Sequence, residues 1–578
     1  MKTVSTISPS RTLPSLRGQT LPAQGADVPP HEELVPLGWR DAAACLLLTA
    51  VLGVAAWIHS DSLVCGEYHD DAIYVSTAKA LAEGEGYRLA HLPGAPPQTK
   101  YPPLYPALLA VVWKLGPDFP ANLPLLKGLS LLCGASALAL AYLFLVRFRY
   151  ASRATALAAT LLTGTGSLFL VFAVVTMAEL LFASLTIVAL WRVELALGRP
   201  PSQPSPAAGG GQGGGAFLDG VLLALPYLCR SVGIVFVPAA LFLLWRARRP
   251  LRWTAAGAAV AMLPWIAWTM TSWMGWGKDP VQGYYTDYFG WWVSLGLPSL
   301  ARVVLWNGLW TIIGVSSLSM EGVSLLLQWL SSAVWTALFV ALGLLVLREL
   351  GLLLYRGRAL AAFVTAYLLL LVVWPWPPQR FLVPLLPLLA ALLLRALGRL
   401  LDRLPFSAQS RVAPVAWALL LLANLVAVMG YDPGRAEGRS VAGNQASWAA
   451  YDRTFDWLRR HSDPQDVLLA ANDPMVYLYT GRRTLYPIVC PPQTLFYGLP
   501  APAGPDPEAS LRALERHRPA YVVLMPRAYG EQPFREWVEN LRRAAPHRLE
   551  RVYADPDDPR FEIYRLRYLS ERVQRRAE

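Results

Sequence analysis

The chain has 578 residues, of which 54% are hydrophobic and only 16% are charged, and its mean hydropathy is +0.36. This composition excludes an ordinary soluble enzyme and predicts a polytopic α-helical membrane protein. The net charge is +12, but Arg and Lys gather between apolar runs, which is the pattern of cytoplasmic loops. The charge therefore reflects membrane orientation, and we expect no nucleic-acid partner.

Apolar runs divide the chain into three regions. Residues 1–40 are polar and Pro-rich and predict a disordered cytoplasmic tail, residues 41–430 a transmembrane domain, and residues 431–578 a soluble domain. With the N-terminus inside, the basic clusters fall on the cytoplasmic side and the C-terminus lies outside. Eleven membrane spans are expected: about 42–60, 124–147, 153–174, 178–197, 216–230, 232–247, 251–271, 323–347, 359–374, 381–401 and 412–429.

Three connections between these spans stand out. The first external loop, 60–123, contains a run at 101–114 that is short for a crossing and predicts a half-embedded helix. Residues 199–215 are rich in Pro and Gly and predict a flexible cytoplasmic linker. Residues 272–322 predict a long external loop whose many aromatic side chains favour the membrane interface.

Residues 431–578 change to a charged, Pro-punctuated pattern. Four short apolar runs there predict strands, and three amphipathic runs predict helices, so the expected unit is a small extracytoplasmic α/β domain. It contains no nucleophile elbow, phosphate loop or metal motif. The strands are expected at 466–470, 521–525, 549–553 and 561–564, and the helices near 446–461, 507–517 and 532–543.

Charged residues at the ends of the spans carry the functional signal, because the expected topology gathers them on the external face. Two adjacent carboxylates near hydrocarbon are costly and rarely idle. The residues in question are Asp70, Asp71, Lys100, Glu179, Arg230 and Arg380.

These residue types suit a sugar donor carried on a polyprenyl phosphate, whose phosphate stays at headgroup level. Departure of the phosphate leaves negative charge, which an Arg side chain meets with paired hydrogen bonds. We assign this role to Arg380, with Arg230 and Lys100 as helpers. An acceptor hydroxyl needs a general base, which Asp70 or Asp71 can supply.

Each residue also has a purely structural interpretation. Asp70 or Asp71 could be the N-cap of a helix over 72–84, although adjacent helical side chains point about 100° apart, so one can cap while the other faces the site. Glu179 could cap its own span. Arg230 and Arg380 could pair with membrane lipids, and His69 could belong to a metal site, although no further ligands follow at fixed spacing.

At these motifs the chain resembles the C-type-fold membrane glycosyltransferases that use polyprenyl-phosphate-linked sugars, such as protein mannosyltransferases and bacterial aminoarabinose transferases. The resemblance covers nearly the whole chain, and its last motif is similar to the outer domain of bacterial members. The motifs are Asp70-Asp71, Tyr101-Pro-Pro-Leu-Tyr-Pro, Thr176-Met-Ala-Glu179, Arg380-Phe-Leu-Val-Pro-Leu-Leu-Pro387 and Asn472-Asp-Pro with Tyr477-Leu-Tyr-Thr-Gly481.

The resemblance implies an inverting transferase that moves a sugar to a lipid, glycan or protein hydroxyl at the outer face of a bacterial inner membrane. It implies that Asp70 is the catalytic carboxylate. Tyr101 and Glu179, which lie in its motifs, and His69, beside the two aspartates, are expected as further site residues. Relatives usually carry Asp-Glu at the position of Asp70-Asp71 and Ser-Glu-Pro around Glu179, and this chain departs from both. No cofactor is assigned, although a divalent cation stays open.

Two other classes of function remain as alternatives. A transporter or flippase of lipid-linked intermediates would carry ionisable groups near the bilayer midplane and broken helices in paired repeats. A non-catalytic scaffold or receptor would leave the Asp pair and Arg380 without a common purpose. The donor sugar and the acceptor stay open.

Overall fold

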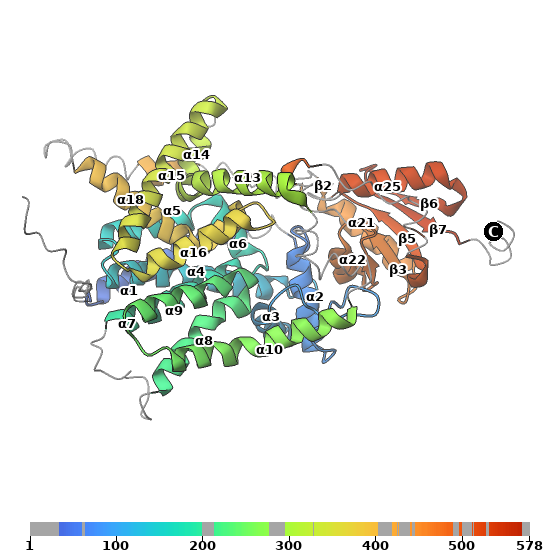
Figure 1. Cartoon of the computed structure of the whole chain (residues 1–578). Coiled ribbons are helices and arrows are strands. Elements are labelled where there is room, and N and C mark those ends of the chain that lie inside the picture. Colours follow the sequence, from blue (N-terminus) through green and yellow to red (C-terminus); the bar gives the residue numbers. More distant parts are fainter. Residues whose placement is uncertain are drawn as a thin grey trace, which may run out of the picture.

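The chain folds into a body of long helices with a smaller α/β domain at one end, and α2 lies between the two (Figure 1). This is a computed structural model. It describes residues 34–59, 64–198, 213–276, 295–327, 329–402, 419–424, 426, 440–441, 446–488, 496–499, 511, 514–526 and 531–568. Most of the predicted N-terminal tail and of the predicted linker 199–215 lies outside these ranges.

The body contains most of the helices. Their bounds are α1 (Trp39–His59), α2 (Asp70–Ala82), α3 (Leu104–Leu115), α4 (Leu123–Arg147), α5 (Arg153–Gly164), α6 (Ser167–Val174), α7 (Glu179–Gly198), α8 (Gly214–Cys229), η1 (Ser231–Val235), α9 (Phe236–Arg246), α10 (Arg252–Trp276), α13 (Gly296–Ser317), η2 (Leu318–Met320), α14 (Glu321–Leu326), α15 (Ser332–Tyr355), α16 (Ala359–Val373), α17 (Gln379–Leu382), η3 (Val383–Leu385) and α18 (Leu386–Leu401).

Within the described residues, six of these helices or continuous helical runs are long and apolar enough to cross a membrane. The bent pair α5 and α6, predicted as one span at 153–174, would make a seventh, with 65° between its halves. The helices at 104–115, 214–229, 231–246 and 359–373 are apolar but shorter. The polytopic helical class is therefore confirmed, whereas the count of eleven spans is not. The predicted span 412–429 is described only at 419–424 and 426, where it is helical.

The prediction of one external loop over 272–322 is wrong in its second half. Residues 296–317 form α13, which with the following turns is a candidate span. Arg302, Asn307 and several small polar residues dilute its apolar run, which is why the sequence pattern did not indicate a span here. The next predicted span, 323–347, is shifted: the long helix there, α15, begins only at Ser332.

Basic residues from distant segments meet at one end of the helical body. Arg358 donates from Nη2 to the carbonyl oxygen of Phe148 at 2.6 Å, and Arg395 donates from Nη1 to that of Tyr150 at 2.9 Å. Both carbonyls follow Arg147 at the end of α4. The clustering that the sequence pattern indicated is thus a feature of the fold.

The α/β domain contains a five-stranded sheet in the order β4-β3-β5-β7-β6. The strands are β3 (Val467–Ala470), β4 (Thr484–Leu485), β5 (Pro519–Leu524), β6 (Leu549–Ala554) and β7 (Glu562–Leu566), and the helices are α21 (Trp448–His461), α22 (Asp473–Thr480), η4 (Glu515–His517), α25 (Glu531–Ala544) and η5 (Pro546–Arg548), with a short hairpin of β1 (Ser440–Val441) and β2 (Ala446–Ser447). Strand β3 pairs in parallel with β4 and β5, whereas β7 pairs antiparallel with β5 and β6.

Helices cover both faces of this sheet, because the central strand β5 is buried on both sides. Tyr521 and Val523 pack toward α21 and α22, whereas Val522 and Leu524 belong to the core that includes α25. This alternation is what the strand period of two requires. All four predicted strands are present within a few residues, and two of the three predicted helices are. The third, 507–517, is described only in part.

The packing of α8 against α10 depends on glycine. A Cβ added at Gly257 would lie 2.0 Å from the carbonyl oxygen of Phe217, and one at Gly220 would lie 2.0 Å from that of Thr254. Small residues let membrane helices approach this closely.

We expect Gly257→Ala to lower the free energy of unfolding by about 1–3 kcal/mol through overpacking, seen as a lower melting temperature. Gly398→Ala is the control, since nothing lies within 4 Å of its added Cβ, and equal melting temperatures of the two variants would contradict this account.

Candidate active site

The two predicted carboxylates open α2 and point to different partners. Asp70 and Asp71 are its first two residues, so the helix begins two residues before the predicted start at 72. Neither acts as the N-cap, which is His69 with no side-chain capping bond. Asp71 is buried and accepts a hydrogen bond from the backbone N–H of Gly66 at 2.6 Å, whereas Asp70 faces the charged residues predicted from other loops.

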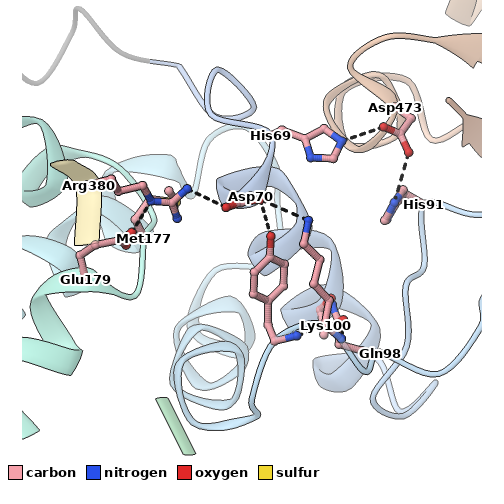
Figure 2. A network of polar contacts seen from close by, with 11 residues as sticks. His69, Asp70, His91, Gln98, Lys100, Met177, Glu179, Arg380 and Asp473 are labelled. Atoms are coloured by element: carbon pink, nitrogen blue, oxygen red, sulfur yellow. Dashed lines mark hydrogen bonds and ion pairs between the residues drawn. The ribbon is translucent and has the colours of Figure 1, made fainter. Parts of the chain in front are cut away.

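Asp70 contacts three side chains from two distant segments (Figure 2). Its Oδ1 accepts a hydrogen bond from the Tyr101 hydroxyl and lies 3.6 Å from Nζ of Lys100. Its Oδ2 accepts from Nη1 of Arg380 at 2.7 Å. The predicted general base and the predicted phosphate ligand are therefore in direct contact.

Arg380 links Asp70 to a second carboxylate. Its Nε donates to Oε1 of Glu179 at 2.5 Å, and Glu179 also pairs with Arg230. Glu179 begins α7, Arg380 lies in α17, and Arg230 lies between α8 and η1. The guanidinium of Arg230 also lies over the ring of Phe381, 5.1 Å from its centroid. Three separate helical segments thus converge on one cluster.

The cluster has an excess of positive charge. Three cations, Arg230, Arg380 and Lys100, face two carboxylates, Asp70 and Glu179, so the five side chains carry a net charge of +1. Glu179 is fully buried and Arg230 nearly so, whereas Asp70 is 19% exposed and Arg380 29%. Asp70 and Arg380 are therefore the members of the cluster that a ligand can reach. The buried pair of Glu179 and Arg230 lies behind them and holds Arg380 in place.

A residue that the sequence did not single out, Gln98, holds the segment carrying Lys100 and Tyr101. Its Oε1 accepts from the backbone N–H of Lys100 at 2.9 Å, and its Nε2 donates to the Thr77 hydroxyl at 3.1 Å. Gln98 is fully buried, so these bonds are costly to lose. They fix the segment to α2, the helix that also presents Asp70.

The cations keep Asp70 ionised. Burial alone would raise the pKa of Asp70, but the charges of Lys100 and Arg380, together with the Tyr101 hydrogen bond, hold it well below its usual range. Asp71 behaves oppositely, because burial raises its pKa to about 6 and the neighbouring Asp70 adds to the rise. Two adjacent carboxylates therefore differ in protonation behaviour, which is common where they serve different tasks.

His69 pairs with a residue of the α/β domain. Its Nε2 lies 2.9 Å from Oδ1 of Asp473, and Nε2 of His91 lies 3.4 Å from Oδ2 of the same carboxylate. In the described part of the chain, no group of three or more His, Cys, Asp or Glu side chains is arranged to hold a metal ion. Neither His91 nor the pairing of Asp473 could be found from spacing, since these partners lie hundreds of residues apart.

No protein-family model and no curated protein sequence matches this chain. Solved structures do. ArnT from Cupriavidus metallidurans bound to undecaprenyl phosphate superposes with a TM-score of 0.52 and 16% identity, over 90% of this chain and 97% of that one. Its apo state gives 0.50 and 15%, over 91% and 98%.

A third similar structure is the Archaeoglobus fulgidus oligosaccharyltransferase tethered with an acceptor peptide containing the NVT sequon. It has a TM-score of 0.50 and 14% identity, over 90% of this chain and 74% of that one. At these identities the similarity is one of fold. The resemblance to C-type-fold membrane glycosyltransferases is thereby confirmed at the level of the fold, over nearly the full length.

The raised pKa of Asp71 predicts a pH-dependent contribution to stability. Because its folded pKa of about 6 exceeds the ordinary value of 3.8, the wild type should lose stability relative to Asp71→Asn as the pH rises from about 4 to about 6. A shift of this size corresponds to about 3 kcal/mol. Melting temperatures of both proteins across this range measure the difference, and a gap independent of pH would contradict the assignment.

Proposed function

We propose that this chain is a glycosyltransferase that moves a sugar from a polyprenyl-phosphate donor to a hydroxyl of a lipid, glycan or protein acceptor. The observation that carries the proposal is the contact between Asp70 and Arg380 within a cluster of net charge +1. A group that can accept a proton thus adjoins groups that can bind a phosphate, on one reachable surface.

In the proposed reaction the acceptor hydroxyl loses its proton to Asp70 while its oxygen attacks the anomeric carbon. The bond between that carbon and the phosphate oxygen breaks, and the electron pair leaves with the phosphate. A single displacement of this kind inverts the anomeric centre. Arg380 meets the leaving oxygen, Lys100 helps through its positive charge 3.6 Å from Asp70, and Tyr101 orients Asp70.

The cations favour the transition state over the bound donor. A sugar linked through phosphate is a diester with one negative charge, whereas the released monoester carries about −1.5 to −2 at pH 7. Groups that stabilise charge appearing only during the reaction raise kcat. This suits Arg380, whose planar guanidinium offers paired hydrogen bonds.

Donor binding also resolves the low basicity of Asp70. With its pKa held down by Lys100 and Arg380, its carboxylate is a weak base in the free protein. A bound phosphate takes up hydrogen bonds of Arg380 and part of the positive field of both cations, so the pKa of Asp70 rises toward its usual range. Proton acceptance is then coupled to the presence of the donor.

The shared fold supports this assignment of substrates. ArnT binds undecaprenyl phosphate in one similar structure, and the oligosaccharyltransferase holds an acceptor peptide in another. Helix α16 separates Arg358, which precedes it, from Arg380, which follows it. The cluster therefore lies away from the basic end of the body, and such basic ends usually face the cytoplasm. We infer that Asp70 faces the outside of a bacterial inner membrane and that the α/β domain shapes acceptor access.

One observation favours the transporter alternative. Helices α5 and α6 meet at a bend of 65°, and the ionisable Glu321 lies against this break. Transporters often form their binding sites at such broken helices. However, Glu321 accepts hydrogen bonds from the Ser167 hydroxyl and from the backbone N–H of Leu168 at 3.2 Å. It therefore satisfies the start of α6, and we rank transport second.

The test is transfer of a radiolabelled sugar from a panel of polyprenyl-phosphate donors by the full chain in membranes. Asp70→Asn should lower the rate by about 10²–10⁴-fold, as loss of a general base does. Arg380→Lys keeps the charge but loses the planar geometry, so kcat should fall more than donor affinity.

Asp219→Asn is the matched control, since Asp219 also pairs with one arginine, Arg192, and is 12% exposed. It should transfer sugar at the wild-type rate. Retained transfer in Asp70→Asn would remove the proposed base. Movement of the labelled lipid between leaflets without a new glycosidic bond would instead establish the transporter.

A further inference from the structure

We propose that Asp473, in the α/β domain, is a positioning residue for Asp70 and acts through His69. The inference rests on the proposed function, because it assigns the α/β domain a part in the transfer step as well as in acceptor access. Figure 2 shows the two contact groups side by side, with Asp473 and His91 on one side of His69 and the partners of Asp70 on the other.

The backbone immediately before Asp70 is strained. His69 has φ 63° and ψ −52°, and the N–H of Asp70 donates to the carbonyl of Tyr68 at 2.7 Å. These values describe a γ-turn of the rare type with positive φ at a residue other than glycine. Such a conformation is energetically unfavourable and persists only where the surroundings hold it. The direction of the first turn of α2, and so of the Asp70 side chain, depends on that hold.

Asp473, in the α/β domain, holds His69 in this conformation. The imidazole of His69 meets Oδ1 of Asp473 at 2.9 Å, and the carboxylate is fully buried. Burial opposes ionisation of Asp473, but hydrogen bonds from His69 and His91 hold its pKa below the usual range. The contact is therefore one between a charged acceptor and a ring donor, stronger than a neutral hydrogen bond.

Neighbours of Asp473 hold the same loop at a second point. Nδ2 of Asn472 donates to the carbonyl of Gly66 at 2.6 Å, and the N–H of Gly66 donates to Asp71. Gly66 has φ +108°, and a Cβ there would lie 2.5 Å from the side chain of Met475. The start of α22 thus grips the segment from Gly66 to His69 at both of its ends.

Further contacts, beyond those of Asn472 and Asp473, hold the α/β domain against α2 and the loop that follows it. The N–H of Thr484 donates to the carbonyl of His91 at 2.8 Å, and Nζ of Lys79 lies 5.2 Å from the ring centroid of Tyr477. Loss of the Asp473 charge should therefore leave the domain docked while it releases His69. The change then falls on orientation of Asp70 rather than on folding.

The experiment compares Asp473→Asn and Asp473→Glu in the full chain reconstituted in membranes. For Asp473→Asn we expect kcat to fall about 10–100-fold, the range that small misplacement of a reacting group produces, with an unchanged KM for the donor. Asp473→Glu, which keeps the charge, should recover part of the loss. In a His69→Gln background, Asp473→Asn should add little further loss, because the two residues act as one unit.

Asp555→Asn is the control, since Asp555 is a buried aspartate of the same domain that pairs with Arg453 at 2.7 Å and lies apart from the loop. It should transfer sugar at the wild-type rate. Equal kcat losses in Asp473→Asn and Asp555→Asn would reduce Asp473 to a folding role and overturn the proposal.

Hydrogen exchange of the 66–73 segment separates this inference from the proposed function. Exchange there should speed up in Asp473→Asn and stay at the wild-type rate in Asp555→Asn, whether or not the protein transfers sugar. A wild type without transferase activity would refute the proposed function, and the exchange result would still show whether Asp473 holds the 66–73 segment. Unchanged exchange in Asp473→Asn would refute the claim that Asp473 holds this segment through His69.

Discussion

The site depends on the ion pair between Asp70 and Arg380, 2.7 Å apart at the edge of the helical body. A carboxylate beside hydrocarbon stays charged only where cations and donors replace its water. Arg380 and Lys100 do this for Asp70, and Arg230 with Arg380 does it for Glu179. Each charged group is tolerated because the others are present, so the cluster forms as a unit from α2, α7, α17, the segment carrying Lys100 and the junction of α8 with η1.

This interdependence divides the cluster into residues that a ligand can reach and buried residues that hold them in place. Arg380 and Asp70 keep the exposed positions, whereas Glu179 is fully buried and anchors both arginines. Gln98 performs a similar supporting task for Lys100 and Tyr101. Groups that bear directly on a ligand are thus fixed by groups that never meet it, which is how a polar site keeps its geometry before substrate arrives.

Local pattern and charge placement predicted much of this arrangement. The span ends that carry Asp70, Glu179 and Arg380 were recognisable because ionisable residues are rare beside apolar runs, and the strands of the α/β domain followed from their apolar runs. Helix α13 was missed because Asn307 and Arg302 weaken its apolar signal. The polar Asn307 side chain is satisfied by the Trp374 carbonyl at 2.7 Å, a contact that sequence spacing does not reveal.

The remaining parts of the site depend on contacts between distant segments. Gln98 and His91 look like ordinary loop residues in the sequence, and Asp473 was recognised only as part of the Asn472-Asp-Pro motif, without a role in the site. Gln98 gains its role only when the loop after α2 folds back onto that helix, and His91 and Asp473 gain theirs only when this loop meets the start of α22. The separation of the two carboxylates into one facing the cations and one facing Gly66 also needed coordinates, because either could have been the first residue of the helix.

The docking of α22 has a consequence for modularity. A sheet with helices on both faces looks like a cassette that could be exchanged between relatives or removed by truncation after the last helix of the body. Yet Asn472 and Asp473 complete hydrogen bonds of a loop that belongs to the body. Any transplanted domain would have to bring the same two side chains in the same register, so the two parts are constrained to diverge together.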